Sequence, residues 1–82
     1  MNKVKLMFFA TLRDRAGTKS AEIQLPAGAT VGDLRGRVAR DYPSLEAALK
    51  SALIAVNREY AGEEALIPEN AEVALFPPVS GG

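Results

Sequence analysis

The chain of 82 residues contains no cysteine and no histidine. Without cysteine it can form no disulfide, no thiolate nucleophile and no cysteine-ligated metal site. Without histidine it lacks the commonest general base and the commonest transition-metal ligand, so neither a Ser-His nor a Cys-His nucleophile can be assembled. Its ten carboxylates are scattered singly among ten basic residues, apart from the neighbours Glu63 and Glu64. We therefore expect no metal site and no self-contained active site.

An excess of charge and a long apolar run are missing as well. The formal net charge is zero, whereas proteins that grip nucleic acid or an anionic membrane carry a positive excess. No stretch approaches the roughly 20 apolar residues that a membrane span needs. The first residues run directly into a strand pattern, without the apolar segment and cleavage site of a signal peptide. We expect a cytoplasmic protein of one domain that binds neither nucleic acid nor membrane.

Alternating apolar residues predict two strands in the first third of the chain. Residues 3–9 have a period of two, which is typical of a half-buried strand. The residues of this segment that are expected to face the core are Val4, Leu6 and Phe8. Residues 20–25 alternate in the same way and predict the second strand of a hairpin. The charged residues between them, 11–18, are predicted to form a loop that turns at Gly17.

A helix is predicted after the break in the pattern at Pro26. Thr30 and Asp33 have the spacing of a capping box, with aspartate in the usual place of glutamate or glutamine. Apolar residues then recur at intervals of three and four and form one stripe, made of Val31, Leu34 and Val38. Pro43 ends this helix, and residues 44–50 predict a second, shorter one.

The rest of the chain predicts three more strands, at residues 53–57, 60–61 and 72–77. In the loop before the last strand, Leu66 and Ile67 are expected to reach the core. This order of elements predicts an α+β fold of the β-grasp (ubiquitin-like) type, in which one main helix packs across a mixed sheet. We expect the domain to span residues 1–78 and to carry a flexible, reactive C-terminal tail at residues 79–82.

The last four residues, 79–82, can be interpreted as a reactive end that enters a channel of another protein. It follows a Pro-Pro pair, which is stiff and ends strand pairing. Because glycine has no Cβ, a narrow channel can close around the end of the tail. The residues expected to thread such a channel are Val79, Ser80 and Gly81. Gly82 is expected to supply a carboxylate that is ionised at neutral pH. The plainer alternative is a frayed end without a function.

This carboxylate can be activated by a partner enzyme. It can attack the α-phosphorus of ATP to give an acyl-adenylate, from which a persulfide sulfur donor displaces AMP and leaves a thiocarboxylate. The transferable sulfur would then lie on the main chain, which is consistent with a chain that has no cysteine. On this interpretation the protein binds no cofactor itself, and its activating partner uses ATP and the sulfur donor.

Three segments resemble the small subunit of molybdopterin synthase: Phe8-Phe9-Ala10 followed by residues 12–17, Ala55-Val56-Asn57 followed by Tyr60, and residues 72–82 with their Phe-Pro-Pro-Val-Ser-Gly-Gly ending. The resemblance implies a sulfur carrier of molybdenum cofactor biosynthesis that is not catalytic by itself. A ubiquitin-activating-like adenylyltransferase would adenylate Gly82, and the thiocarboxylate would donate sulfur to a cyclic pyranopterin precursor inside the large subunit. Such synthases are typically heterotetramers. One departure is Pro68-Glu69-Asn70-Ala71, where the family usually has Asp-Gly-Asp or a similar turn; Asn70 tolerates a left-handed conformation.

Strand alternation suggests how a partner docks, because Phe9 and Phe76 lie on the strand faces opposite the expected core residues Phe8 and Leu75. The plainer alternative is that the sheet buries them on its second face. We expect Phe9, Tyr60 and Phe76 to form an apolar surface patch for the large subunit, and Arg13 to make a polar contact at the rim of a partner. Three alternatives stay open. The chain could be a thiamine-pathway sulfur carrier, a ubiquitin-like protein modifier joined to lysines through Gly82, or an interaction module with an inert tail.

Overall fold

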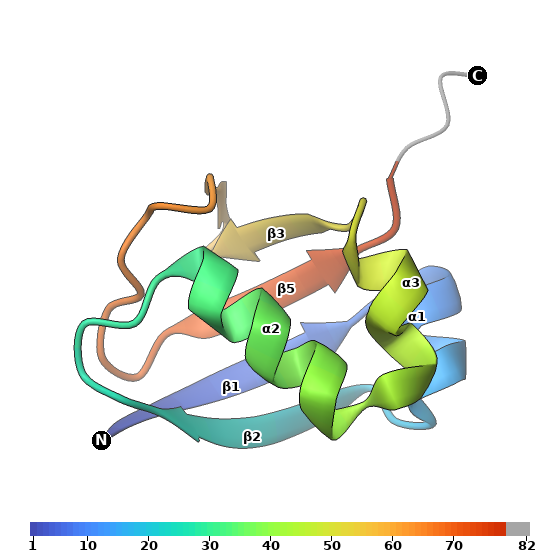
Figure 1. Ribbon diagram of the computed structural model, residues 1–82, viewed down its shortest axis with the longest axis horizontal. Coiled ribbons are helices and arrows are strands. Elements are labelled where there is room, and N and C mark those ends of the chain that lie inside the picture. Colours follow the sequence, from blue (N-terminus) through green and yellow to red (C-terminus); the bar gives the residue numbers. More distant parts are fainter. Residues whose placement is uncertain (79–82) are drawn as a thin grey trace.

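A computed structural model of the chain describes residues 1–78, which form a five-stranded sheet with helices packed on one face (Figure 1). The strands are β1 (Asn2–Phe8), β2 (Ser20–Leu25), β3 (Leu53–Val56), β4 (Glu59–Tyr60) and β5 (Glu72–Phe76). Their order across the sheet is β2-β1-β5-β3-β4. The central strands β1 and β5 run parallel, and every other neighbouring pair is antiparallel. The predicted mixed sheet of the β-grasp type is confirmed.

The alternation of β1 sets which side of the sheet is buried. Val4, Leu6 and Phe8 are almost fully buried, as predicted, whereas Lys3 and Lys5 are exposed on the other side. Because side chains alternate between the faces of a strand, a slip of one residue would expose the whole apolar set. The strand ends one residue earlier than the sequence suggests, at Phe8.

The main helix α2 (Val31–Asp41) crosses the sheet and closes the core (Figure 1). Its capping box is formed as predicted: the Asp33 amide donates to the Thr30 hydroxyl oxygen at 3.2 Å, and the Thr30 amide donates to the Asp33 carboxylate at 3.0 Å. The apolar stripe of Val31, Leu34 and Val38 is fully buried. Burying one such side chain stabilises the fold by about 1.5–3 kcal/mol.

The prediction that residues 11–18 form a charged loop is wrong in part, because a helix covers most of them. This helix, α1 (Ala10–Ala16), buries one side chain, Leu12. It begins after Phe9 without a side-chain cap, and it ends at Gly17, whose φ of 78° is left-handed and whose amide donates to the Arg13 carbonyl. Gly17 therefore closes a helix instead of only turning a loop. The predicted short helix after Pro43 is present as a 3-10 turn, η1 (Pro43–Leu45), followed by α3 (Glu46–Leu49).

The long loop before β5 corrects a second prediction. Ile67 reaches the core, but Leu66 is 68% exposed. The Ile67 amide donates to the Ala29 carbonyl at 3.0 Å, and Leu66 forms an isolated bridge with Thr30. This extended pairing turns adjacent side chains to opposite sides, so only one of the two can face inward. Asn70, in the turn whose sequence differs from the usual one of the family, has a left-handed conformation with a φ of 58°.

The buried Asn2 side chain fastens the same loop to the start of β1. Its amide group donates to the carbonyls of Ile67 and Pro68, and its oxygen accepts from the Asn70 amide at 2.8 Å.

Among residues 1–78, no helix is long and apolar enough to cross a membrane.

Candidate docking face

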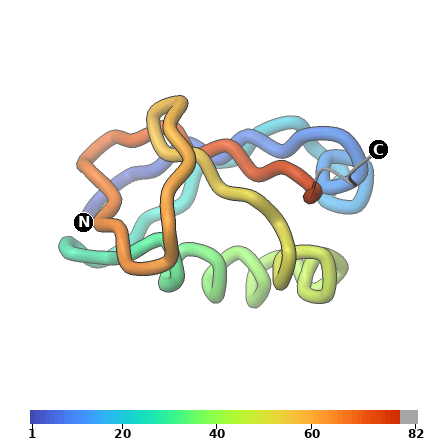
Figure 2. The backbone as a smooth tube through the Cα atoms, turned by 90° about the horizontal axis from the view of Figure 1, so that it is seen from above, coloured from blue at the N-terminus to red at the C-terminus, as the bar shows by residue number. Residues whose placement is uncertain are grey.

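The face of the sheet opposite α2 has no helix packed on it within the described part of the chain (Figure 2). Strand register shows two neighbouring cross-strand rows of side chains on this face. One row is charged and consists of Glu22, Lys5 and Glu72. The next row is mostly apolar and consists of Ser20, Met7, Ala74, Ala55 and Tyr60. The open face is therefore charged at one end and apolar toward the end of β5.

Three aromatic side chains gather at the apolar end, and we call Phe9, Tyr60 and Phe76 the aromatic patch. The Phe9 and Phe76 rings stack with centroids 4.7 Å apart, and the Tyr60 ring meets Phe76 edge-on at 6.3 Å. The sequence predicts that these residues lie together on the surface, and the structure places them so. Tyr60 is 71% exposed and Phe9 is 40% exposed, so the sheet does not bury them on its second face. Their role in docking stays a prediction.

Small residues form the floor beside the patch. Ala55 and Ala74 are less than one-tenth exposed, yet they lie outside the helix-side core cluster. They are register partners on β3 and β5, and Ala55 in turn pairs with Tyr60. The sequence alone does not show that these alanines adjoin the aromatic patch, because this depends on the order of the strands in the sheet. Large aromatics next to a flat floor of small residues are suited to contact another protein.

Arg13 lies on α1 and not in a loop, and its side chain is exposed. It contributes to a hollow of about 280 Å³ beside the aromatic patch. The hollow is lined by Lys5, Met7, Phe8, Phe9, Arg13, Lys19 and Ser20. The structure thus brings Arg13 next to Phe9, and the polar contact with a partner that the sequence predicts for Arg13 stays a prediction. Lys19 shares this hollow and is not among the predicted site residues.

The base of the tail lies next to the same patch. The chain leaves β5, one of the inner strands of the sheet, through the half-buried Pro77 and the exposed Pro78. The Phe9 amide donates to the Leu75 carbonyl at 3.2 Å, which joins the start of α1 to the end of β5 (Figure 2). The predicted tail residues Val79, Ser80, Gly81 and Gly82 lie outside the described residues.

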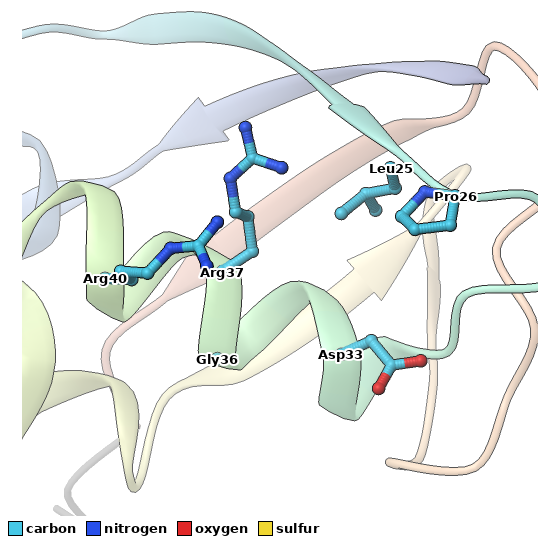
Figure 3. A pocket seen from close by; sticks show the side chains of 6 residues that line it. All are labelled: Leu25, Pro26, Asp33, Gly36, Arg37 and Arg40. Atoms are coloured by element: carbon cyan, nitrogen blue, oxygen red, sulfur yellow. The ribbon is translucent and has the colours of Figure 1, made fainter.

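A second hollow lies on the helix side, between α2 and β2 (Figure 3). It has a volume of about 450 Å³ and is lined by Leu25, Pro26, Asp33, Gly36, Arg37 and Arg40. Its polar groups already have partners in the protein. Arg37 pairs with Asp41 at 2.8 Å and donates to the Gln24 carbonyl, and Asp33 belongs to the capping box. These contacts stabilise the fold and leave the aromatic patch as the stronger candidate. Within residues 1–78, no three His, Cys, Asp or Glu side chains are grouped as metal ligands.

Comparison with known proteins agrees with this geometry. Residues 6–82 match the model of the ThiS family. The chain belongs to the ThiS family. A molybdopterin synthase sulfur carrier subunit from Dictyostelium discoideum is 36% identical over 99% of this chain and 98% of its own. The corresponding subunit from Escherichia coli is 35% identical over 96% of this chain and 99% of its own.

Solved structures of similar proteins share the fold. SAMP1 from Haloferax volcanii is 29% identical, with a TM-score of 0.88 over 99% of this chain and all of its own. A putative molybdopterin converting factor, subunit 1, from Pyrococcus furiosus is 31% identical, with a TM-score of 0.87 over 96% of this chain and all of its own. These likenesses identify the ThiS family member as a ubiquitin-like protein, as the order of its elements predicts.

Proposed function

We propose that this ThiS family member is a sulfur carrier of molybdenum cofactor biosynthesis. The observation that carries the proposal is its similarity, from end to end, to curated sulfur carrier subunits of molybdopterin synthase. The fold supports it, because the strand that leads into the tail ends beside an exposed aromatic patch. A partner can therefore hold the patch while it takes up the tail.

The chemistry of the proposal takes place at Gly82, with ATP and a sulfur donor supplied through an activating adenylyltransferase. The carboxylate attacks the α-phosphorus of ATP and releases pyrophosphate. The outer sulfur of a persulfide donor then displaces AMP and forms an acyl disulfide, and a thiol attacks the donor's inner sulfur, which releases the thiocarboxylate and leaves a disulfide. The resulting thiocarboxylate donates its sulfur to a cyclic pyranopterin precursor, and the carboxylate is regenerated. The match to the family model extends through residue 82, which supports the choice of this residue.

The docking residues follow from the open face. The aromatic patch binds the large subunit of molybdopterin synthase, and Val79, Ser80 and Gly81 thread the channel that leads to its active site. Glycine at position 81 adds no Cβ to the width of the tail. We place the reaction in the cytoplasm, where ATP and the sulfur donor are available, and cell fractionation would test that location.

An intact-mass experiment tests the central step. The purified protein is weighed first, which establishes whether Gly82 is the last residue, and is weighed again after incubation with the activating enzyme, ATP and a sulfur donor. The expected change is the replacement of one oxygen by sulfur at Gly82. Adding one alanine after Gly82 moves the carboxylate by up to about 3.6 Å and should slow adenylation by about 100-fold or more.

One further variant and two contrary outcomes keep this experiment decisive. Gly81→Val should slow the same reaction without shifting the melting curve, because its branched side chain widens the tail outside the folded domain. If the extended protein is adenylated as fast as the native one, Gly82 is not the working group. A native protein that gains no sulfur under any of these conditions contradicts the proposal as a whole.

A second candidate function is protein modification, because one structure of similar fold is that of a small archaeal modifier protein 1 from Methanosarcina acetivorans, 29% identical with a TM-score of 0.84. A modifier would form an isopeptide bond between Gly82 and a lysine of another protein, whereas a carrier is released unchanged after each transfer. Denaturing electrophoresis of a tagged protein separates the two outcomes.

A third possibility is a sulfur carrier of thiamine biosynthesis. Binding to the large subunit of molybdopterin synthase distinguishes the molybdopterin pathway from this one.

A further inference from the structure

The hollow beside Phe9 carries positive charge that the protein does not neutralise. Its lining contains Lys5, Arg13 and Lys19 and no carboxylate. None of these three cations forms an ion pair within residues 1–78. The arginines of the helix side differ, because Arg35 and Arg37 are paired with carboxylates of the chain. The hollow therefore lacks a counter-charge from its own protein.

Two of the three cations carry most of this excess. Lys5 lies between Glu22 and Glu72 in the charged row of the sheet, so it has acidic neighbours on both sides. Arg13 projects from α1 and Lys19 directly precedes β2. Their backbones are fixed, because the Gly17 amide donates to the Arg13 carbonyl at 3.0 Å and the Phe8 amide donates to the Lys19 carbonyl at 2.8 Å.

We propose that Arg13 and Lys19 together bind a carboxylate-rich segment of the activating enzyme. This inference rests on the proposed function, and it adds Lys19 and the chemistry of the partner. The apolar side chains of Met7 and Phe9 in the same hollow suit a protein segment better than a phosphate chain.

The contact suits the activating enzyme, because the complex of carrier and activator is short-lived. A carrier must meet its activator and leave it in every round of sulfur loading. Charge pairs at the rim of an interface mainly accelerate association, and they weaken as salt screens them. The aromatic patch supplies apolar area, whereas Arg13 and Lys19 supply the steering that a short-lived complex needs.

Stopped-flow association with the purified activating enzyme tests the proposal. The variants are Arg13→Glu, Lys19→Glu and the double change, each measured at low and at high salt. We expect each single change to slow association by about tenfold at low salt and the double change to slow it further, with all rates converging at high salt. The matched control is Lys50→Glu, which makes the same charge change at an exposed position in the helix layer.

Several results would overturn the proposal. One is a Lys19→Glu protein that associates at the native rate; another is a Lys50→Glu protein that is slowed equally, which would show an effect of net charge alone. If the changes slow association with the large subunit but not with the activating enzyme, the hollow binds the large subunit instead. If an oligonucleotide competes with the activating enzyme, the hollow binds phosphate groups. If the native protein gains sulfur normally, any of these results removes only this inference and leaves the proposed function intact.

Discussion

The two faces of the sheet treat apolar side chains in opposite ways. On the helix side, Leu6, Leu34 and Val73 are fully buried. On the open side, the rings of Phe9 and Tyr60 are 40% and 71% exposed. Burial on the helix side stabilises the domain, whereas exposure on the open side keeps apolar area available for a partner. The helix side thus supplies the stability of the domain, whereas the binding that we propose belongs to the open side.

Charge follows the same division. On the helix side Arg35 and Glu63 are joined at 2.9 Å, and Arg35 also donates to the backbone carbonyls of Leu49 and Ala52. On the open side Arg13 and Lys19 have no such partners among the described residues. Each face can therefore be changed without changing the other, and the following variants test that separation.

The largest effect is expected from Leu34→Ala, in the centre of the buried stripe. Removing a fully buried leucine side chain leaves a cavity and should lower the free energy of unfolding by about 2–5 kcal/mol. Urea denaturation measures this loss. The affinity of the remaining folded protein for the large subunit should stay native at low temperature. A large loss of affinity in the folded fraction would show that the two faces are coupled.

Phe76→Arg should have the reverse effect. It places a charge in the middle of the aromatic patch and should weaken binding to the large subunit by about 2 kcal/mol or more, since aromatic residues at the centre of an interface contribute most of its affinity. Calorimetric titration measures the change, and circular dichroism confirms folding. The control is Ala47→Arg, which introduces the same side chain at an exposed position of α3. Native affinity in a folded Phe76→Arg protein would remove the patch from the interface.

Thr30→Ala tests the start of α2 and should cost about 1 kcal/mol of stability. The change removes the hydroxyl that accepts from the Asp33 amide. Thermal unfolding gives the loss, and adenylation of the folded protein should not change. Asp33→Ala removes the other half of the capping box and serves as a companion variant. An unshifted melting curve in both would show that the box does not stabilise the helix.

The smallest effect is expected at the turn between β3 and β4. Asn57 and Arg58 both have positive φ, of 50° and 73°, as in the two-residue turns that favour Asn-Gly. Arg58→Gly relieves the left-handed strain of about 1 kcal/mol but loosens the unfolded chain, so a net gain of roughly 0.5 kcal/mol in stability is expected. Denaturation with urea resolves such a gain, and a clear loss of stability would contradict it.

The regular elements could be predicted from the sequence because their signals are local. The period of two in β1 and the pair of Thr30 and Asp33 each specify one structure without reference to the rest of the chain. Helix α1 was missed because it is short, begins without a side-chain cap and buries only Leu12. Leu66 was misplaced because the bridge to Thr30, a long-range contact, decides which way it faces.

The candidate site divides in the same manner. The three aromatics could be placed on one surface from strand alternation, although Phe9 lies just beyond the strand that was expected to hold it. The floor of Ala55 and Ala74 and the share of Lys19 in the hollow depend on which strands are neighbours. Neighbour relations across a sheet are set by the packing of the whole domain, so no short segment contains them.

The central position of β5 has a mechanical consequence. The tail continues from a strand that is bonded on one side to β1 in parallel and on the other to β3 in antiparallel. A pull on the tail acts along β5 and loads both ladders of hydrogen bonds in shear, so that many must break together. A strand at the edge, or one pulled across its ladder, would unzip one bond after another. Under the proposed function, an enzyme could therefore draw the tail tight in its channel while the domain outside keeps its shape.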